Sequence, residues 1–124
     1  MGLMSPGLGD IGTFVTGTGK TAASVANGQE GVLATLELPC AGVWVITATG
    51  WWPTDVSAGY VYLEHNGGTI GGIGHQSYQF SVAGIESISG KSAVNLKIVN
   101  WSEKTVSNLT VPGLKFRAVK VGNV

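Results

Sequence analysis

The pattern of hydrophobic and polar positions centres on one long predicted strand that follows a turn at Pro39–Gly42. Alternation puts one set of its residues on one side (Val43, Val45, Thr47, Thr49 and Trp51) and a second set on the other (Trp44, Ile46, Ala48 and Trp52). Neither set is clearly polar, and no charge occurs between Glu37 and Asp55. A strand with one solvated face alternates apolar and polar residues, so we expect this strand to be covered on both faces. One cover would be the core and the other a second subunit.

Shorter strands are predicted along the rest of the chain, at Ile11–Thr16, Lys20–Ala26, Val32–Leu38, Tyr60–His65, from Thr69, and at Tyr78–Ala83, Ala93–Trp101, Thr105–Val111 and from Leu114. In the third of these, alternation places Val32, Ala34, Leu36 and Leu38 inward and Leu33, Thr35 and Glu37 outward. Asn66-Gly67 predicts a hairpin turn, and Gly17–Gly19 a turn between strands. The last strand loses its alternation near Val119–Val121, which indicates a bulge.

No window carries the apolar spacing of a helix, and the chain contains 20 glycines. Eight to ten short strands at regular spacing predict an all-β protein: an antiparallel β-sandwich, specifically a jelly roll. Residues 1–10 are rich in Gly and Pro and are expected to form a flexible leader, and residues 11–124 a single domain.

Composition narrows the possible partners. The 124 residues carry seven basic and seven acidic side chains, and only 11% of the chain is charged. There is no basic stripe for nucleic acid and no apolar run or signal peptide that would direct the chain to a membrane, so neither partner is expected. A surface so poor in charge favours subunit contacts. Cys40 is the only cysteine, which excludes an intrachain disulfide, and is interpreted as a small hydrophobic residue.

Two glycine-rich segments resemble nucleotide-binding motifs, but neither has the features that such a site requires. Gly7–Gly12 matches G-x-G-x-x-G, but no strand precedes it and no helix follows. Gly17–Thr21 resembles part of a phosphate-binding loop but has Phe14 where the first glycine belongs. His65 and His75 are the only histidines and lack the close spacing of zinc ligands, so they are interpreted as ordinary polar positions near a hairpin. We expect no metal and no cofactor.

Catalytic patterns are equally absent from the sequence. No serine lies in a G-x-S-x-G elbow, so a Ser-His-Asp triad has no support in the local sequence. A glycan hydrolase or lyase would need a carboxylate pair, with Asp55, Glu64 and Glu86 as the residues to test, but no pair can be located. The patterns at Asn100–Ser102 and Asn108–Thr110 match N-glycosylation sites and are interpreted as chance. We expect no enzyme.

The aromatic residues after the central strand offer the best candidate site. Flat rings stack on the apolar faces of sugars while polar neighbours hold the hydroxyl groups. The expected saccharide-binding residues are Trp51, Trp52, Asp55, Tyr60, His75 and Tyr78. The competing interpretation is that these rings belong to the core or to a subunit interface, since large aromatic residues are common in both.

Several segments together resemble a known family. They are the Leu-x-Leu-Pro-x-x-Gly-x-Trp-x-Ile run at Leu36–Ile46, the Tyr/Leu hairpin strand Tyr60–His65, AVNLKIVNWS at Ala93–Ser102 and LKFRAVKVG at Leu114–Gly122. This combination is similar to the trimeric head domains at the C-termini of bacteriophage tail fibres and receptor-binding proteins. Those domains are similar in turn to the jelly rolls of the tumour-necrosis-factor and complement globular-head superfamily.

The resemblance implies a homotrimer of phage or prophage origin that binds a host cell-surface saccharide. It implies no catalytic residue and transfers no binding residue. It also implies other virion proteins as partners and a location in the virion, at the tail fibre or tail tip, after synthesis in the bacterial cytoplasm. The alternative is a structural virion component of the same fold without a glycan ligand.

Overall fold

The computed structural model describes residues 10–124, and within them it contains eleven strands and no helix. The expected leader falls, apart from Asp10, outside the described residues. The strands are β1 (Phe14–Thr16), β2 (Thr18–Gly19), β3 (Ala22–Val25), β4 (Glu30–Leu38), β5 (Gly42–Trp51), β6 (Gly59–His65), β7 (Gly68–Gly74), β8 (Gln79–Ile88), β9 (Ser92–Asn100), β10 (Val106–Leu109) and β11 (Lys115–Gly122).

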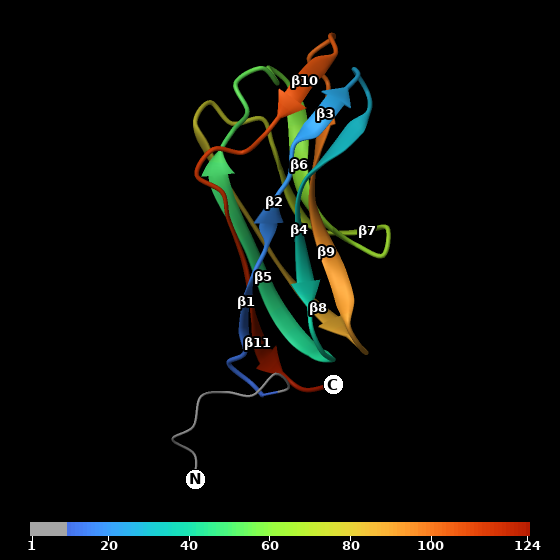
Figure 1. The fold of residues 1–124 in the computed structure, drawn as a ribbon, viewed down its shortest axis with the longest axis vertical. Coiled ribbons are helices and arrows are strands. Elements are labelled where there is room, and N and C mark those ends of the chain that lie inside the picture. Colours follow the sequence, from blue (N-terminus) through green and yellow to red (C-terminus); the bar gives the residue numbers. More distant parts are fainter. Residues whose placement is uncertain (1–9) are drawn as a thin grey trace.

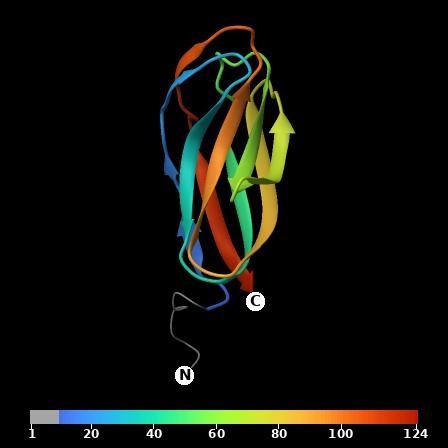
Figure 2. The ribbon, with the colours of Figure 1, turned by 90° about the vertical axis from the view of Figure 1, so that its right-hand side faces the viewer.

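The strands form two layers packed face to face (Figures 1 and 2). Sheet A has the order β1-β11-β5-β8, sheet B has the order β2-β4-β9-β6-β7, and β10 pairs with β3 in a short ribbon. Every pairing is antiparallel. The chain passes from β4 in sheet B to β5 in sheet A and back to β6, then repeats the crossing from β7 through β8 to β9. This order confirms the predicted antiparallel β-sandwich with jelly-roll connections.

Alternation along each strand builds the core between the sheets. In β5 the inner positions are Trp44, Ile46 and Ala48, all fully buried as predicted, and in β9 they are Val94, Leu96 and Ile98. The Trp44 indole donates a hydrogen bond of 3.2 Å to the Cys40 carbonyl, which satisfies its one polar atom inside the core. Each inner position removes apolar surface from water, and that burial holds the two sheets together.

The predicted orientations of Leu33 and Val32 are wrong. Leu33 was expected to face outward, but it is fully buried beside Ala34, while Val32 is partly exposed. The pairing of β4 with β9 shifts register between Val32 and Ala34. A bulge adds one residue to a strand, so the residues before and after it no longer alternate in phase. The bulge predicted for the last strand is confirmed, since the β11–β5 register shifts between Lys120 and Gly122.

The turns are set by residues that tolerate positive φ. Asn66 and Gly67 have φ angles of 50° and 80°, which confirms the hairpin between β6 and β7. The early strands are shorter than predicted: the first begins at Phe14 rather than Ile11, and the second covers only Ala22–Val25. Thr18–Gly19, predicted as a turn, instead pairs with β4 as the short strand β2.

The outer face of sheet A carries an apolar row across all four strands. Its members are cross-strand neighbours in the order Phe14, Val119, Val45 and Ile85. Phe14 is 57% exposed and Ile85 67% exposed, so no other part of residues 10–124 covers the row. The charged side chains at outward positions of these strands are Lys115 and Arg117 of β11. Within residues 10–124, therefore, only one face of β5 is covered, and the second cover expected from the sequence is not among these residues.

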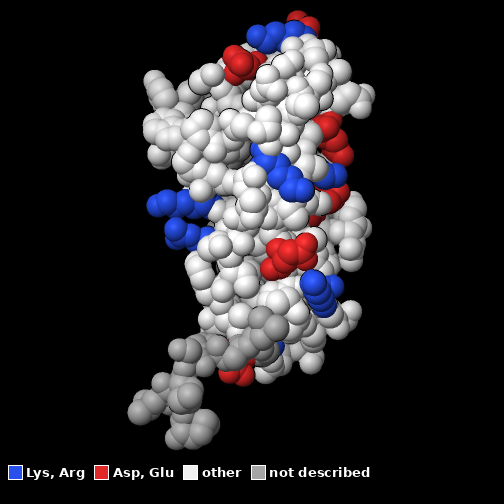
Figure 3. Space-filling model, viewed as in Figure 1, with Lys and Arg blue, Asp and Glu red and all other residues white. Residues whose placement is uncertain are grey.

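The outer face of sheet B has a polar central part. Its centre is Lys97, whose ammonium group lies 2.7 Å from a Glu64 carboxylate oxygen and 3.4 Å from a Glu30 carboxylate oxygen. Asn95 donates a hydrogen bond of 3.2 Å to Glu64 and accepts one of 2.9 Å from the Thr35 hydroxyl. We call these residues the sheet B network. Over the whole view in Figure 3, charged side chains are few and scattered.

Candidate functional site

A cavity of about 510 Å³ opens at the end of the sandwich opposite Val124. Three segments far apart in sequence line it: the end of β5 with the following loop, the loop before β8, and β10 with the loop before β11. Their lining residues are Trp51, Trp52, Pro53, Thr54, Asp55, Ser77, Tyr78, Asn108, Leu109, Thr110 and Pro112. We call this the distal cavity.

Backbone hydrogen bonds hold the three segments together. The Trp51 amide donates to the Pro112 carbonyl at 2.9 Å, and the Trp52 amide donates to the Tyr78 carbonyl at 2.7 Å. Trp51 and Trp52, which are adjacent at the end of β5, thus hold the loop before β11 and the loop before β8. The cavity wall is therefore built on the end of a central strand, which favours a preformed shape over one that assembles on binding.

Trp52 supports the cavity from beneath. Its side chain is only 4% exposed, and its indole donates a hydrogen bond of 2.7 Å to the Val56 carbonyl within the same loop. Phe80 and His75 meet its ring edge-on, with the His75 ring centroid 5.2 Å away. A buried indole with its N–H satisfied acts mainly in packing, so Trp52 positions the loop rather than presenting a stacking surface.

The exposed aromatic surface comes from Trp51 and Tyr78. Trp51 is 46% exposed and Tyr78 is 74% exposed, and Asp55 and Asn108 supply a carboxylate and an amide to the same cavity. Trp51 also borders a second hollow, of about 440 Å³, whose lining includes Gln76, Gln79 and Lys115. The indole therefore stands between a mostly apolar cavity and a more polar hollow, with rings available for stacking and side chains available for hydrogen bonds.

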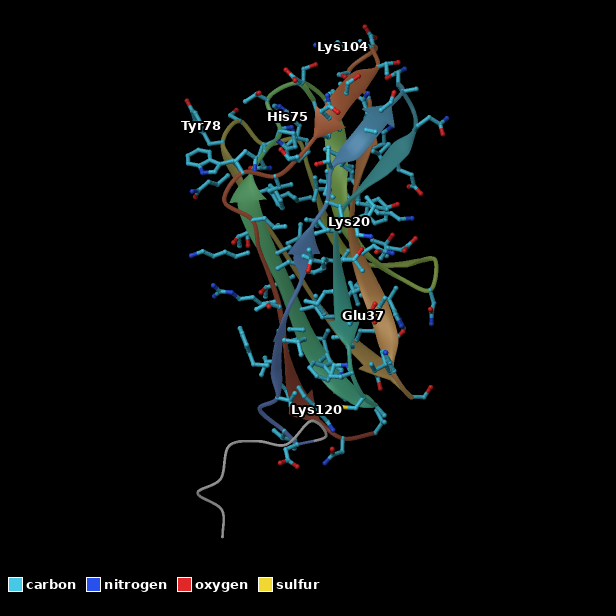
Figure 4. All side chains as sticks on the ribbon, viewed as in Figure 1. Lys20, Glu37, His75, Tyr78, Lys104 and Lys120 are labelled. Carbon is cyan, nitrogen blue, oxygen red and sulfur yellow. The ribbon has the colours of Figure 1, made fainter. Side chains whose placement is uncertain are left out.

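The structure gathers four of the six residues expected from the sequence: Trp51, Trp52, Asp55 and Tyr78 all line the distal cavity. His75 touches the edge of Trp52 instead, and Figure 4 shows it near Tyr78 at the same end of the molecule. Tyr60 is elsewhere. The sequence analysis missed Asn108, Thr110 and Pro112, because only the hydrogen-bonded approach of β10 and its following loop brings them to this end.

Tyr60 lies on the outer face of sheet B. Its ring stacks on Tyr62 with centroids 5.9 Å apart and lies 6.5 Å from the ring of Trp101, which is 52% exposed. The Tyr62 hydroxyl donates to a Glu30 carboxylate oxygen. Burial, together with this hydrogen bond, raises the pKa of Tyr62 well above its usual value. This aromatic group belongs to the sheet B surface and does not reach the distal cavity.

Other chemistry suggested by the sequence is limited within residues 10–124. They contain no cluster of three or more His, Cys, Asp or Glu side chains suited to a metal, and no helix long and apolar enough to cross a bilayer. Asn100, in one of the glycosylation patterns, is fully buried, and its amide donates to the carbonyls of Val25 and Lys104 at 2.9 and 2.7 Å.

No protein-family model matches the chain, and comparison with curated proteins finds no match.

Proposed function

We propose that this domain is a homotrimeric receptor-binding head of phage or prophage origin that recognises a host cell-surface saccharide in the distal cavity. The observation that carries the proposal is the meeting of exposed Trp51 and Tyr78 with Asp55 and Asn108 around about 510 Å³ of open space. The aromatic rings would stack on the apolar faces of sugar rings. The carboxylate and amide would accept and donate hydrogen bonds to hydroxyl groups.

The position of the cavity supports an attachment role. The distal cavity lies at the end of the sandwich away from Val124 (Figure 1), and the segment before β1 lies at that other end, where the Gly12 amide donates to the Lys120 carbonyl. A fibre that enters the domain next to β1 would therefore hold the cavity away from the virion. Other virion proteins would then contact the opposite end.

The apolar row supports assembly with further copies of the chain. Four neighbouring apolar side chains, two of them more than half exposed, lie on a face with few charges. Burying such a face against identical copies removes it from water and gives a closed symmetric oligomer. Trp51 is an outward residue of the same strand as Val45, so the cavity would lie close to the boundary between subunits.

The test is a glycan array probed with the purified protein and with two single-tryptophan variants. We expect Trp51→Ala to weaken binding by about tenfold or more, because removing a central stacking ring costs on the order of 2 kcal/mol. Trp101→Ala is the matched control: it removes a similarly exposed indole from sheet B and should bind as the unmodified protein does.

Two outcomes would contradict the proposal. Equal loss in both variants would show that the distal cavity is not the site. If the folded protein binds no glycan but binds another virion protein tightly, the structural alternative is correct. In that case the apolar row would remain as the basis for assembly.

A further inference from the structure

Three polar side chains meet between the two sheets, where β8 turns into β9 (lower right in Figure 1). His65 is the last residue of β6, Glu86 lies in β8, and Ser92 is the first residue of β9. The His65 Nδ1 atom is 2.8 Å from a Glu86 carboxylate oxygen, and its Nε2 atom is 2.5 Å from the Ser92 hydroxyl. Both ring nitrogens are therefore engaged, each by a different strand.

These side chains point inward. His65 follows Val61 and Leu63 on the inner face of β6, and Ser92 precedes Val94 on the inner face of β9. Glu86 lies on the same side of β8 as Val82 and Ile88. A sandwich fills such positions mainly with apolar residues, so three hydrogen-bonded polar groups there need a specific explanation. His65 lies beside the hairpin, as interpreted from the sequence, and the structure adds that both of its ring nitrogens are hydrogen-bonded.

The hydrogen bonds fit an arrangement of protons in which the His65 imidazole is neutral and Glu86 is a carboxylate. An ionised carboxylate can only accept, so the Nδ1 atom of His65 carries the proton and donates it to Glu86. The Nε2 atom then has a free lone pair and accepts the hydroxyl proton of Ser92. This is the relation between a nucleophile, a general base and a group that orients the base.

The group is open to small molecules. A cavity of about 390 Å³ is lined by both His65 and Ser92, together with Asn66, Lys91 and the loop Ser87–Gly90. The His65 side chain is 10% exposed and the Glu86 side chain 32% exposed, and Glu86 is not among the residues that line this cavity. Asn66 and Lys91 are hydrogen-bond donors at the cavity, where they can stabilise negative charge that develops on a carbonyl oxygen.

We propose that Ser92, His65 and Glu86 form an acyl-transfer site that hydrolyses small carboxylic esters. The Ser92 oxygen attacks the ester carbonyl carbon while its proton passes to His65 Nε2. The carbon–oxygen bond to the alcohol breaks, and the alcohol leaves with that proton. Water then attacks the acyl-serine by the same route, which releases the carboxylic acid and restores Ser92. Glu86 is a positioning residue that holds the imidazole and stays ionised throughout.

The first experiment uses the intact protein and an alkyl fluorophosphonate, which forms a serine–phosphorus bond as fluoride leaves. We expect one adduct by mass spectrometry, located at Ser92 by peptide mapping. Ser92→Ala and His65→Gln should lose the adduct. Ser107→Ala removes an exposed hydroxyl from β10, outside this cavity, and should keep it. Thermal unfolding of each variant verifies that it is folded.

The second experiment measures hydrolysis of p-nitrophenyl acetate. We expect a rate about 100-fold or more above the uncatalysed reaction, since a positioned general base contributes that much. Ser92→Ala should return the rate to background. Glu86→Gln should lower kcat with little change in KM, and Glu86→Asp should restore part of the loss, which a merely structural carboxylate would not do.

Three results would overturn this proposal: no adduct on folded protein, an adduct at another serine, or unchanged hydrolysis in Ser92→Ala. Each of these results would mean that the three side chains only link the two sheets through hydrogen bonds. The proposal is independent of saccharide binding, because the distal cavity shares no lining residue with this one. Ser92→Ala should therefore bind glycans as the unmodified protein does.

Discussion

The outer faces of the two sheets differ, although both sheets contribute equally regular strands to one core. The outer face of sheet A presents the apolar row, with Ile85 67% exposed, while sheet B presents Lys97 between Glu64 and Glu30. Sheet B satisfies its polar groups within the chain and is suited to water. Sheet A leaves apolar surface uncovered and is suited to a partner.

This difference shows how a small domain with few charges divides its surface. The sheet B network holds Glu30, Glu64 and Lys97 close together, so their charges offset one another locally. Of the outward charges of sheet A, Lys115 lies toward the end near the distal cavity, whereas Arg117 borders the apolar row and lines one shallow hollow with Phe14, Val45 and Val119. The row itself contains no charged residue, so an assembly centred on it would have to leave only the neighbouring Arg117 in contact with water or with a partner charge.

The largest expected effect comes from placing a charge within the apolar row. Ile85→Lys costs the isolated subunit little, because Ile85 is already 67% exposed. In an assembled trimer the new ammonium group would be buried without a partner, which weakens association by about 100-fold or more, roughly 3 kcal/mol. Sedimentation velocity should show conversion of the trimer to a single subunit of 12.7 kDa.

The matched control is Val99→Lys, an outward apolar position on sheet B. It should leave the assembly intact. If both variants dissociate equally, the comparison between the two faces fails.

The second prediction concerns the bulge in β4, which turns Leu33 into the core and leaves the outer face of sheet B less apolar. Leu33→Ala should lower the free energy of unfolding by about 3 kcal/mol, because it leaves a cavity at a fully buried site. Val32→Ala, at the neighbouring partly exposed position, should cost less than about 1 kcal/mol. Urea denaturation measures both values, and the reverse order would mean that β4 alternates without a bulge.

The smallest effect tests the sheet B network through pH. The hydrogen bond from Lys97, and next that from Asn95, lowers the pKa of Glu64, and the hydrogen bond to Glu64 raises the pKa of Lys97. The ionised Glu64 side chain thus stabilises the folded state above its unfolded-state pKa, about 4.3. This stabilisation is lost as pH falls through the lower pKa of the folded state. The charged Lys97 side chain stabilises the folded state below its unfolded-state pKa, about 10.4. This stabilisation is lost as pH rises through the higher pKa of the folded state.

Lys97→Met should therefore destabilise the protein by about 1–2 kcal/mol at pH 7 and by less near pH 3. Unfolding by urea at both values measures the difference. Lys20→Met, at an exposed lysine, serves as the control and should show no such pH dependence. A constant penalty at both pH values would show that Lys97 acts through packing of its alkyl chain instead.

The sequence predicted the fold well because alternation and turn chemistry are local. The inner face of β5, the Asn66-Gly67 hairpin and the bulge near Lys120 all follow from neighbouring residues. The bulge at Leu33 did not, because a run of consecutive apolar residues fits either register. The second predicted strand was shortened to β3, which pairs with distant β10, and part of a predicted turn became β2 through pairing with β4.

The site was only partly predictable for the same reason. Trp51, Trp52 and Asp55 are close in sequence and remain close in space, whereas Asn108 reaches the distal cavity only through long-range packing. The prediction wrongly placed Tyr60 in the site. Its side chain is on the outer face of sheet B, where it stacks on Tyr62, and it does not line the distal cavity. The meeting of Ser92 with His65 and Glu86 was missed altogether. No local motif marks residues that come from three strands.

The central claim, that the outer face of sheet A is an interface between copies of this chain, is tested most directly by the mass of the purified protein in solution. Light scattering after size exclusion should give three times 12.7 kDa. That result would also direct the search for the saccharide to the part of the distal cavity nearest the neighbouring subunit. A stable species of 12.7 kDa would contradict the account. It would mean that Phe14, Val45, Val119 and Ile85 remain in contact with water.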